Sequence, residues 1–278
     1  MAAKGVKAPA LLGMEMAKPL LAIDVKREER RITAFIRQVV TRSGASGVVV
    51  GLSGGVDSSV VFALCVRALG KDGVLAALLP SNHTPPSDTE DAVRLADEWR
   101  VKRISVAISP LVDALISATG SDAVKLARAN VQARVRMTML YYLANSRGLL
   151  VVGTGDRSEE LLGFFTKFGD GGVDFLPIAH LYKTQVRLMG KYLGIPSDIV
   201  NKPASPQLWP GHTAEEELPA GYEKLDIVMH CLFDAGGSVS RAATEAGVSR
   251  TVVHRILEMN RKSAHKRTLP PSLRPPSG

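Results

Sequence analysis

The chain has 278 residues, of which 45% are hydrophobic and 22% charged, so it is long enough to bury a sizeable core in one large or two small domains. It contains no run of eighteen or more apolar residues, and its first twenty positions lack the pattern of a secretory signal, so we expect a soluble, cytoplasmic protein. The two cysteines, Cys65 and Cys231, stand in apolar helical patterns, which argues against a disulfide framework or a thiolate zinc site and predicts buried thiols.

The net charge of +8 is distributed unevenly along the chain. Residues 1–18 carry +2 and residues 261–278 carry +5, which leaves only +1 for all the positions between them. Because the basic residues belong mainly to the two ends, the charge does not predict a nucleic-acid-binding face across the fold.

Residues 1–18 are rich in Ala, Pro and Lys without periodicity, and we expect a flexible extension there. A helical pattern then runs from Glu28 to Ser43 and leads into a strand-like apolar run, Gly47 to Leu52. The pattern continues with a helix ending at Gly70, a strand at 74–79, a helix at 88–99, a strand at 103–108, a long helix at 122–146 and a strand at 149–152. This alternation predicts a doubly wound, Rossmann-like parallel α/β sheet, in which ligands collect at the carboxyl ends of the strands.

Beyond Pro177 the pattern becomes mostly helical. Helices are expected at Lys183 to Leu193, Tyr222 to Phe233, Ser238 to Ala246 and Arg250 to Lys262. The connection at 201–221 is rich in Pro, Gly and Glu, and loops of that length are often functional lids. We therefore expect one domain over residues 19–268, with an α/β core at about 44–200, a lid at about 201–221 and C-terminal helices at 222–262, followed by a Pro-rich tail at 269–278.

The most informative stretch is Ser53 to Ser59, SGGVDSS, where the first strand turns into a helix. Gly54 and Gly55 allow backbone N–H groups to close on a phosphate, and the following helix directs its positive end at the same place. Asp57 supplies a hard oxygen ligand of the kind that magnesium requires. The stretch lacks the Gly-Lys-Ser/Thr ending of a Walker loop and resembles the PP-loop of ATP pyrophosphatases, which release pyrophosphate and transfer AMP to a substrate oxygen.

A second loop-to-helix turn, Gly153 to Glu159, follows another strand, and the run Gly163 to Pro177, GFFTKFGDGGVDFLP, comes soon after it. Together they place a Thr hydroxyl, carboxylates and a Lys within a short segment. A loop that is exposed to solvent does not require phenylalanines between its Gly and Lys residues. Their presence favours a binding role for the segment.

With these motifs in place, the chain closely resembles the NAD synthetases, which amidate nicotinic acid adenine dinucleotide (deamido-NAD). The resemblance runs from about Leu20 to Pro271 and includes the separated motifs VVVGLSGGVDSS, NVQARVRMTMLYYLAN, VVGTGDRSE, GFFTKFGDGGVDFLP, LYKTQV, LGIP, KPASPQLWPGHTAEEEL and AHKR. Asp156 departs from the family pattern, which often has Asn at that position.

The resemblance implies the following site residues. Those for ATP are Gly51, Leu52, Ser53, Gly54, Gly55, Val56, Asp57, Ser58, Ser59, Thr154, Lys183 and Ser205; those for deamido-NAD are Arg134, Lys167, Asp174, His265 and Lys266. Asp57 and Glu159 would hold Mg²⁺, and with Lys183 they form the implied catalytic set, in which Lys183 neutralises charge on the leaving pyrophosphate. Spacing alone does not decide which of Arg134 and Arg136 points to solvent.

The implied reaction has two steps. The nicotinate carboxylate attacks the α-phosphorus of ATP, and ammonia then displaces AMP from the acyl adenylate. A glutamine-dependent version needs a further domain with a nucleophilic Cys that residues 1–27 cannot contain, so free ammonia is the expected donor, although a separate glutaminase partner stays open. The resemblance also implies a homodimer.

Two alternatives remain. Another PP-loop enzyme, such as a different amide-forming synthetase or a tRNA-modifying enzyme, would use the same ATP chemistry, but this chain has no CxxC pair of the kind many tRNA thiolases carry. The segment Ser238 to Leu257 looks like a helix-turn-helix DNA reader. We favour a structural pair of helices joined at Gly247, because so short a pattern has many false matches.

Overall fold

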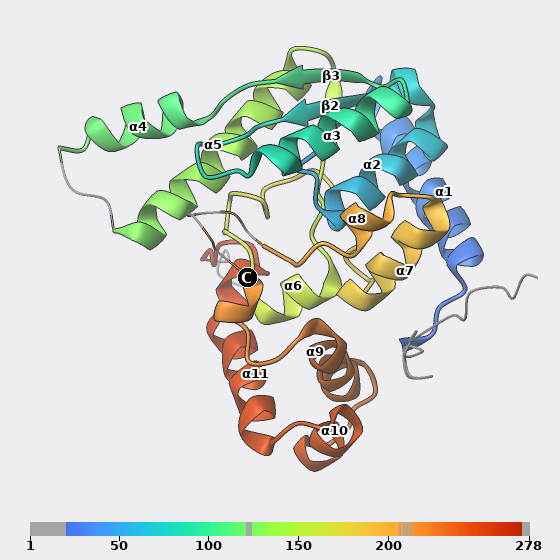
Figure 1. Cartoon of the computed structure of the whole chain (residues 1–278), viewed down its shortest axis with the longest axis vertical. Coiled ribbons are helices and arrows are strands. Elements are labelled where there is room, and N and C mark those ends of the chain that lie inside the picture. The colour runs from blue at the N-terminus through green and yellow to red at the C-terminus, as the bar shows by residue number, and fades with distance from the viewer. Residues whose placement is uncertain are drawn as a thin grey trace, which may run out of the picture.

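The computed structural model describes residues 21–120, 124–205, 207, 209, 211 and 213–273. Within these residues, four parallel strands form one sheet in the order β3-β2-β1-β4 (Figure 1). The strands are β1 (Gly47–Gly51), β2 (Val74–Leu78), β3 (Lys102–Ser105) and β4 (Leu149–Val152). The chain steps outward from β1 to β3 and then returns to place β4 on the other side of β1, so the direction of winding reverses between β1 and β4.

Helices cover both faces of this sheet because successive strand residues point in opposite directions. Val48 and Val50 pack with α1 (Val25–Ser43), α2 (Val56–Leu69), α3 (Pro86–Glu98) and α7 (Lys183–Leu193). Val49 points to the other face, where α4 (Ser109–Ser117) and α5 (Lys125–Asn145) lie. The predicted doubly wound α/β fold is therefore confirmed.

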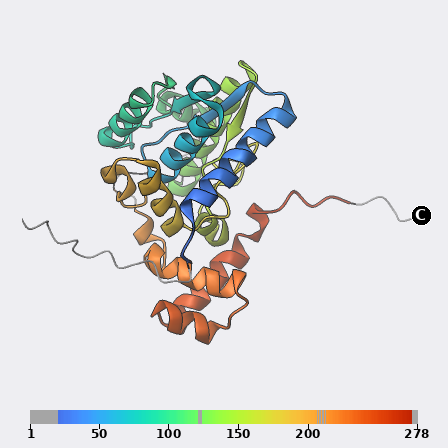
Figure 2. The same cartoon turned by 90° about the vertical axis from the view of Figure 1, so that its right-hand side faces the viewer.

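The C-terminal helices form a second hydrophobic core below the sheet (Figures 1 and 2). They are α9 (Tyr222–Met229), which continues into a π-helical turn at His230–Asp234, α10 (Val239–Ala246) and α11 (Arg250–Lys262). Gly247 ends α10 with a φ of 61°, and Ser249 caps α11, so the two helices meet at a sharp turn. Ala242 of α10 and Val253 and Ile256 of α11 are buried in the same hydrophobic core as residues of α9, so α10 and α11 form a packed pair joined at Gly247.

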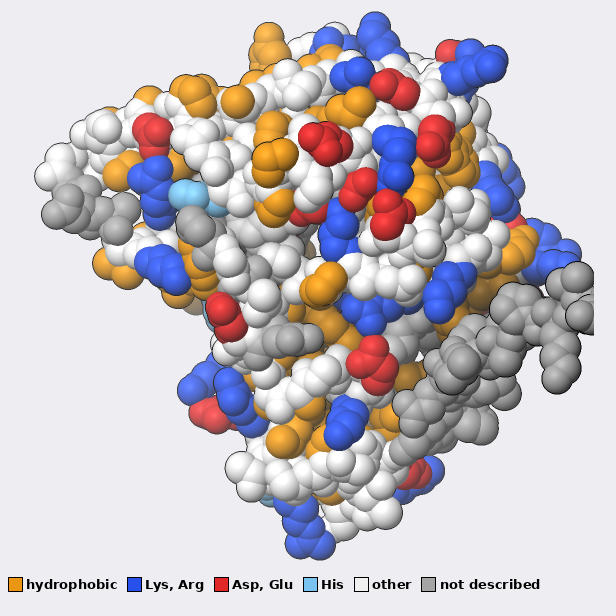
Figure 3. Space-filling view, viewed as in Figure 1, with side chains coloured by type: hydrophobic (Ala, Val, Ile, Leu, Met, Phe, Trp, Pro, Cys, Tyr) orange, Lys and Arg blue, Asp and Glu red, His pale blue; other side chains and the backbone are white. Residues whose placement is uncertain are grey.

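Acidic and basic side chains lie next to one another over α3 on the face shown in Figure 3. Arg94 pairs with Asp91 at 2.8 Å and with Asp198 at 2.7 Å, and Arg103 pairs with Asp97 at 2.9 Å. Exposed ion pairs of this kind contribute little to stability. They do mean that this face carries both signs of charge, in keeping with the charge distribution along the sequence.

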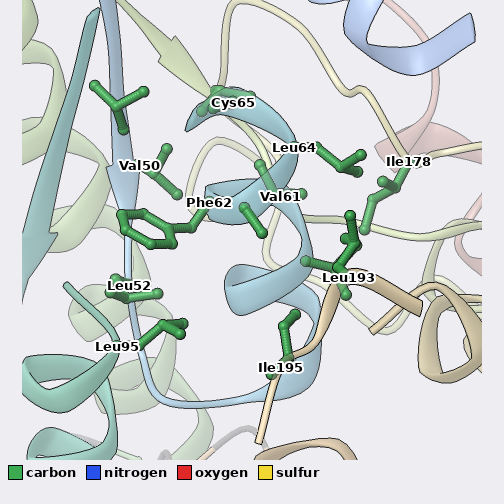
Figure 4. Packing of buried hydrophobic residues seen from close by; sticks show 14 of the residues in the cluster. Val50, Leu52, Val61, Phe62, Leu64, Cys65, Leu95, Ile178, Leu193 and Ile195 are labelled. Atoms are coloured by element: carbon green, nitrogen blue, oxygen red, sulfur yellow. The ribbon is translucent and has the colours of Figure 1, made fainter. Parts of the chain in front are cut away.

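Helix α2 is apolar around most of its circumference because it is enclosed on several sides. Phe62 points toward Val50 and Leu52, whereas Leu64 faces Ile178 on the opposite side (Figure 4). Cys65 is fully buried in the same helix, and Cys231 is buried in the second core, so the expectation of buried thiols is confirmed. This enclosure fixes the helix whose first turn carries the end of the PP-loop.

Other boundaries differ modestly from the sequence expectations. The third strand runs from Lys102 to Ser105 rather than over 103–108, and α4, which the sequence pattern missed, begins at Ser109. The remaining short helices are α6 (Arg157–Leu162), α8 (Ser197–Val200) and the 3-10 turns Lys71–Gly73, Ala214–Glu216 and Ala264–Lys266. The predicted extension at 1–18 lies outside the described residues, as does part of the predicted tail. Among the described residues, we find no helix with both the length and the apolar character needed to cross a membrane.

Candidate active site

A cavity of about 420 Å³ opens at the carboxyl ends of β1, β2 and β4. It lies where the direction of winding reverses, which is the usual place for a ligand in an open parallel sheet. Its volume is within the range of about 300–1,000 Å³ typical of small-molecule sites. The PP-loop, the end of β2, one face of α5, the loop after α6 and the start of the 201–221 connection all contribute to its wall.

The PP-loop is held in shape by its own side chains. Ser53 Oγ lies 3.1 Å from Ser58 Oγ and accepts the backbone N–H of Gly55 at 3.3 Å. Ser58 and Ser59 both donate to the carbonyl of Gly55, at 3.0 and 2.8 Å. Of the residues implied for ATP, Gly51, Leu52, Ser53, Gly55, Val56, Asp57, Thr154, Lys183 and Ser205 line the cavity. Gly54, Ser58 and Ser59 lie outside that lining and support the loop.

Three carboxylates surround one ammonium group at the base of the cavity. Lys183 Nζ lies 2.8 Å from Asp57 Oδ1, 3.0 Å from Asp156 Oδ2 and 2.8 Å from Glu159 Oε1. Lys183 is 1% exposed and Asp156 is fully buried, whereas Asp57 and Glu159 keep about a fifth of their exposure and line the cavity. The sequence placed Asp57, Glu159 and Lys183 in one catalytic set, and the structure brings them together.

Asp156 is the member of this cluster that the sequence analysis missed. It caps α6, where its Oδ1 accepts the N–H of Glu159 at 2.8 Å, and Glu159 Oε2 accepts the N–H of Asp156 at 3.3 Å. The D-x-x-E spacing at a helix start is a sequence signal for this capping box. It predicts the cap but not that the second carboxylate oxygen of Asp156 faces Lys183.

The cluster has the chemistry of a site for a divalent cation. Oxygen atoms of Asp57, Asp156 and Glu159 lie within 4.8 Å of one another. Asp57 Oδ1 and Asp156 Oδ2 are buried, and each pairs with Lys183 Nζ, at 2.8 and 3.0 Å. Hard carboxylate oxygens of this kind are the ligands that Mg²⁺ prefers, so the residues fit the ion that the sequence predicted.

The electrostatics of the cluster follow from its burial. Burial raises the pKa of Asp156 to about 7 and that of Glu159 to about 8, with Lys183 opposing both shifts. Burial acts to lower the pKa of Lys183, but the carboxylates of Asp156, Asp57 and Glu159 raise it well above its usual value. Lys183 therefore stays charged, whereas Asp156 and Glu159 hold protons near neutral pH that an arriving cation would displace.

Three of the five residues implied for deamido-NAD form a chain of hydrogen bonds, and the fourth, Lys266, directly follows the last of them, His265, in the sequence. Arg134 donates to the carbonyl of Lys167 at 3.3 Å, and Lys167 Nζ donates to the carbonyl of His265 at 2.7 Å. Lys266 Nζ donates to the carbonyls of Gly163 and Phe165, both at 2.7 Å, and lines the cavity. The C-terminal segment therefore folds back beside the loop after α6, as the resemblance required.

Asp174, the fifth residue, occupies a different position. Its Oδ2 accepts the N–H of Val151 at 2.7 Å, and its Oδ1 accepts from the hydroxyl of Tyr141 at 3.2 Å. Tyr141 and Arg134 both belong to α5, about two turns apart at 3.6 residues per turn. Asp174 is thus held at the end of β4, away from the four basic residues.

The structure also settles which arginine of α5 faces the cavity. Arg134 is exposed, whereas Arg136 lines the cavity and its Nε donates to the carbonyl of Leu79 at 3.0 Å. Burial lowers the pKa of Arg136 to about 10, and the charge of Asp170 opposes that shift. Residues two apart lie on different sides of a helix, so the two side chains had to diverge, but only the packing shows which one turns inward.

The 201–221 connection contributes two further residues that the sequence analysis missed. Lys202 Nζ lies 2.6 Å from both Asp88 Oδ1 and Asp91 Oδ2 and donates to the carbonyl of Gly54 at 3.2 Å. Trp209 lines the cavity, and the ammonium of Lys125 lies 4.0 Å from the centre of its ring. Both contacts join this connection to the elements that form the cavity.

Comparisons with known proteins agree with this geometry. The sequence model of the NAD synthase family matches residues 28–270. The NH(3)-dependent NAD(+) synthetase of Hyperthermus butylicus is 50% identical over 254 residues, which is 91% of this chain and 92% of that protein. The structure of NMN synthetase from Francisella tularensis has a TM-score of 0.81 at 33% identity and covers 92% of this chain and 100% of its own. The NH3-dependent NAD synthetase from Campylobacter jejuni has a TM-score of 0.77 at 29% identity, covering 91% and 100%.

Proposed function

Because the chain belongs to the NAD synthase family, we propose that it is an ammonia-dependent ligase that converts deamido-NAD to NAD and ATP to AMP and pyrophosphate. The observation that carries this proposal is the cluster of Lys183, Asp57 and Glu159 at the base of a cavity whose wall includes the PP-loop. A buried ammonium beside a phosphate-binding loop is suited to pyrophosphate release.

In the first step, a nicotinate carboxylate oxygen attacks the α-phosphorus of ATP. A new O–P bond forms, the bond to the β-phosphate oxygen breaks, and pyrophosphate leaves with the bonding electrons. The PP-loop and the first turn of α2 would bind the phosphates, because the helix N-terminus is attractive to anions. Lys183 would stabilise the charge on the leaving group, since its position is already set by three carboxylates.

In the second step, ammonia attacks the carbonyl carbon of the acyl adenylate. The C–N bond forms, the C–O bond to AMP breaks with its electrons going to the AMP oxygen, and the nitrogen loses one proton to solvent as the amide is made. No side chain needs to form a covalent bond with the substrate, so the chain's contribution is to position the reactants and neutralise charge.

Magnesium would be held by Asp57 and Glu159, with the buried Asp156 behind them. When bound, Mg²⁺ neutralises charge on the phosphates of ATP. The close approach of the three carboxylates, whose oxygen atoms lie within 4.8 Å of one another, supports this assignment.

The dinucleotide would bind along Arg134, Lys167, His265 and Lys266, with Asp174 beside Tyr141 of α5. The chain of contacts that joins the basic residues supports one continuous anion-binding strip. Several large apolar side chains nearby are exposed, among them Tyr142 at 66% and Phe168 at 55%. They support the homodimer that the family resemblance implies, which a mass measurement in solution tests. A cytoplasmic location remains an expectation from the sequence alone.

The decisive experiment supplies purified protein with ATP, Mg²⁺, ammonium and deamido-NAD. We expect NAD, AMP and pyrophosphate in equal amounts, whereas ADP in place of AMP would contradict the proposed chemistry. Because NMN synthetase has a similar structure, nicotinic acid mononucleotide is the matched second substrate. The kcat/KM ratio of the two substrates decides between NAD and NMN formation, and glutamine in place of ammonium should give little product.

A further inference from the structure

The N-terminal end of α7, which carries Lys183, is held by a carboxylate from outside the cavity. The backbone N–H of Thr184 donates to Asp226 Oδ2 at 2.9 Å, and the Thr184 hydroxyl donates to the same oxygen at 2.8 Å. The first N–H groups of a helix have no partner inside the helix, so an acceptor at this place fixes where the helix begins.

The same carboxylate reaches the neighbouring helix through a serine. Ser158 Oγ donates to Asp226 Oδ1 at 2.6 Å and accepts the backbone N–H of Lys183 at 2.9 Å. Ser158 directly precedes Glu159 in α6. Asp226 therefore connects the backbone positions of both partners in the Lys183–Glu159 ion pair, which measures 2.8 Å.

This network is buried and belongs to the second core. Asp226 and Ser158 are both 0% exposed, and Asp226 comes from α9, which packs against both α6 and α7. A buried carboxylate is costly unless hydrogen bonds satisfy it, and here three donors do so beside the positive end of a helix. Burial raises the pKa of Asp226 to about 6, and bonds from Ser158 and Thr184 oppose the shift.

The position of Asp226 requires a side chain in which both terminal atoms accept hydrogen bonds, as the two carboxylate oxygens do. An asparagine would have to direct its NH₂ group at Ser158 or at Thr184. At Thr184 it would meet the backbone N–H, and at Ser158 it would remove the acceptor that the hydroxyl proton uses. Either orientation shifts one of the two helices that carry the ion pair.

We propose that Asp226 is a positioning residue for the ATP-dependent step, which fixes Lys183 and Glu159 relative to Asp57 through α7 and α6. The C-terminal helices thereby contribute to the chemistry from the second core, although Asp226 is not part of the cavity lining. This inference rests on the proposed function, because it requires that Lys183 acts in pyrophosphate release.

The test measures pyrophosphate release by full-length wild type, Asp226→Asn and Ser158→Ala over a range of ATP concentrations up to saturation, with deamido-NAD held at saturation. Each variant should lose at least about tenfold in kcat, since small misplacements of reacting groups cost up to about a hundredfold. The KM for ATP should change by less than about threefold, because the PP-loop itself is unaltered. The kcat of the double variant should be within about twofold of that of Asp226→Asn, since both changes break one network.

Val228→Ala is the matched control, because Val228 lies on the same helix, is fully buried and makes only apolar contacts in the second core. It should lower the melting temperature without lowering kcat at 25 °C. If Asp226→Asn does not fold, Ser158→Ala decides, since it removes only a hydroxyl. A kcat within twofold of wild type in the folded variants would overturn the proposal. Failure of the wild type to release pyrophosphate would instead overturn the proposed function.

Discussion

The carbonyl oxygen of Asp88 occupies the space that a side chain on Gly54 would need. Gly54 has a φ of 81°, and a methyl group built on it would overlap that oxygen. Lys202 joins the same two residues, because its Nζ donates to the Gly54 carbonyl at 3.2 Å and pairs with Asp88 Oδ1 at 2.6 Å. The PP-loop is thus held between the first turn of α3 and the start of the 201–221 connection.

Gly54→Ala should therefore destabilise the fold and prevent ATP binding. An alanine held in the left-handed backbone conformation lowers the stability of the fold by about 1–2 kcal/mol, and the overlap with Asp88 lowers it further. Gly55→Ala is the matched control, because Gly55 has a φ of −90° and its Cβ would approach only Ser53 Oγ, at 3.5 Å. It should keep near-normal stability but weaken ATP binding, since Gly55 lines the cavity. Urea unfolding and calorimetric ATP titration distinguish the two; equal stability for both variants would contradict the structure.

Lys183→Met should remove the positive charge from three crowded carboxylates. Breaking a buried ion pair leaves uncompensated charge and costs about 3–5 kcal/mol. Added Mg²⁺ should restore part of the lost melting temperature, because the carboxylates can then bind the ion instead of the ammonium. Lys262→Met provides the comparison: its pair with Glu258 is exposed to solvent, so the change should leave the melting temperature almost unaltered. No response of Lys183→Met to Mg²⁺ would count against the metal assignment.

Asp57→Asn should abolish pyrophosphate release and leave the fold intact. The amide is neutral and offers a single oxygen, so it is a poor ligand for Mg²⁺ and a poor partner for Lys183. Circular dichroism checks the fold and a pyrophosphate assay checks the reaction. Asp97→Asn, which breaks only the surface pair with Arg103, should react at the wild-type rate. Near-normal pyrophosphate release by Asp57→Asn would argue against its assigned role.

Arg134→Ala should raise the KM for deamido-NAD and leave ATP binding unchanged. A hydrogen bond to a charged group contributes about 1.5–3 kcal/mol to the free energy of binding. Its loss corresponds to a rise of about tenfold to a hundredfold in the KM for deamido-NAD. Arg37 also donates to a backbone carbonyl, that of Ala68, and Arg37→Ala should affect neither substrate. An unchanged KM for the dinucleotide in Arg134→Ala would place its binding site elsewhere.

The raised pKa of Asp226 predicts a pH dependence of stability. Its folded-state pKa of about 6 lies above the ordinary value of 3.8, so the native state binds this proton more tightly than the unfolded chain does. Its contribution to stability is therefore fully present below the ordinary value and is lost as the pH rises through the folded one, by about 3 kcal/mol in all. The free energy of unfolding of wild type relative to Asp226→Asn should fall from about pH 4 to about pH 6 and level off by about pH 7. If this difference in the free energy of unfolding rises with pH over the same interval, the pKa of Asp226 is not raised in the folded protein.

The sheet, most of the helices and the PP-loop could be predicted from the sequence because their signals are local. An apolar run such as Val48–Val50 marks a strand, and two glycines between it and a helix mark a loop that can receive phosphate. Helix α4 was missed because it is short and leaves Leu111 and Leu115 exposed, so its residues do not show a clear buried face.

Only the tertiary structure decided how the site is completed. Asp57, Asp156 and Lys183 follow different strands and loops, and Asp226 arrives from a second core, so no spacing along the chain brings them together. The same holds for the choice of Arg136 over Arg134 as the residue that faces the cavity. The physical reason is that the sequence specifies which groups can bind phosphate or metal, whereas burial and contacts between distant elements determine which of them meet and what charge they carry.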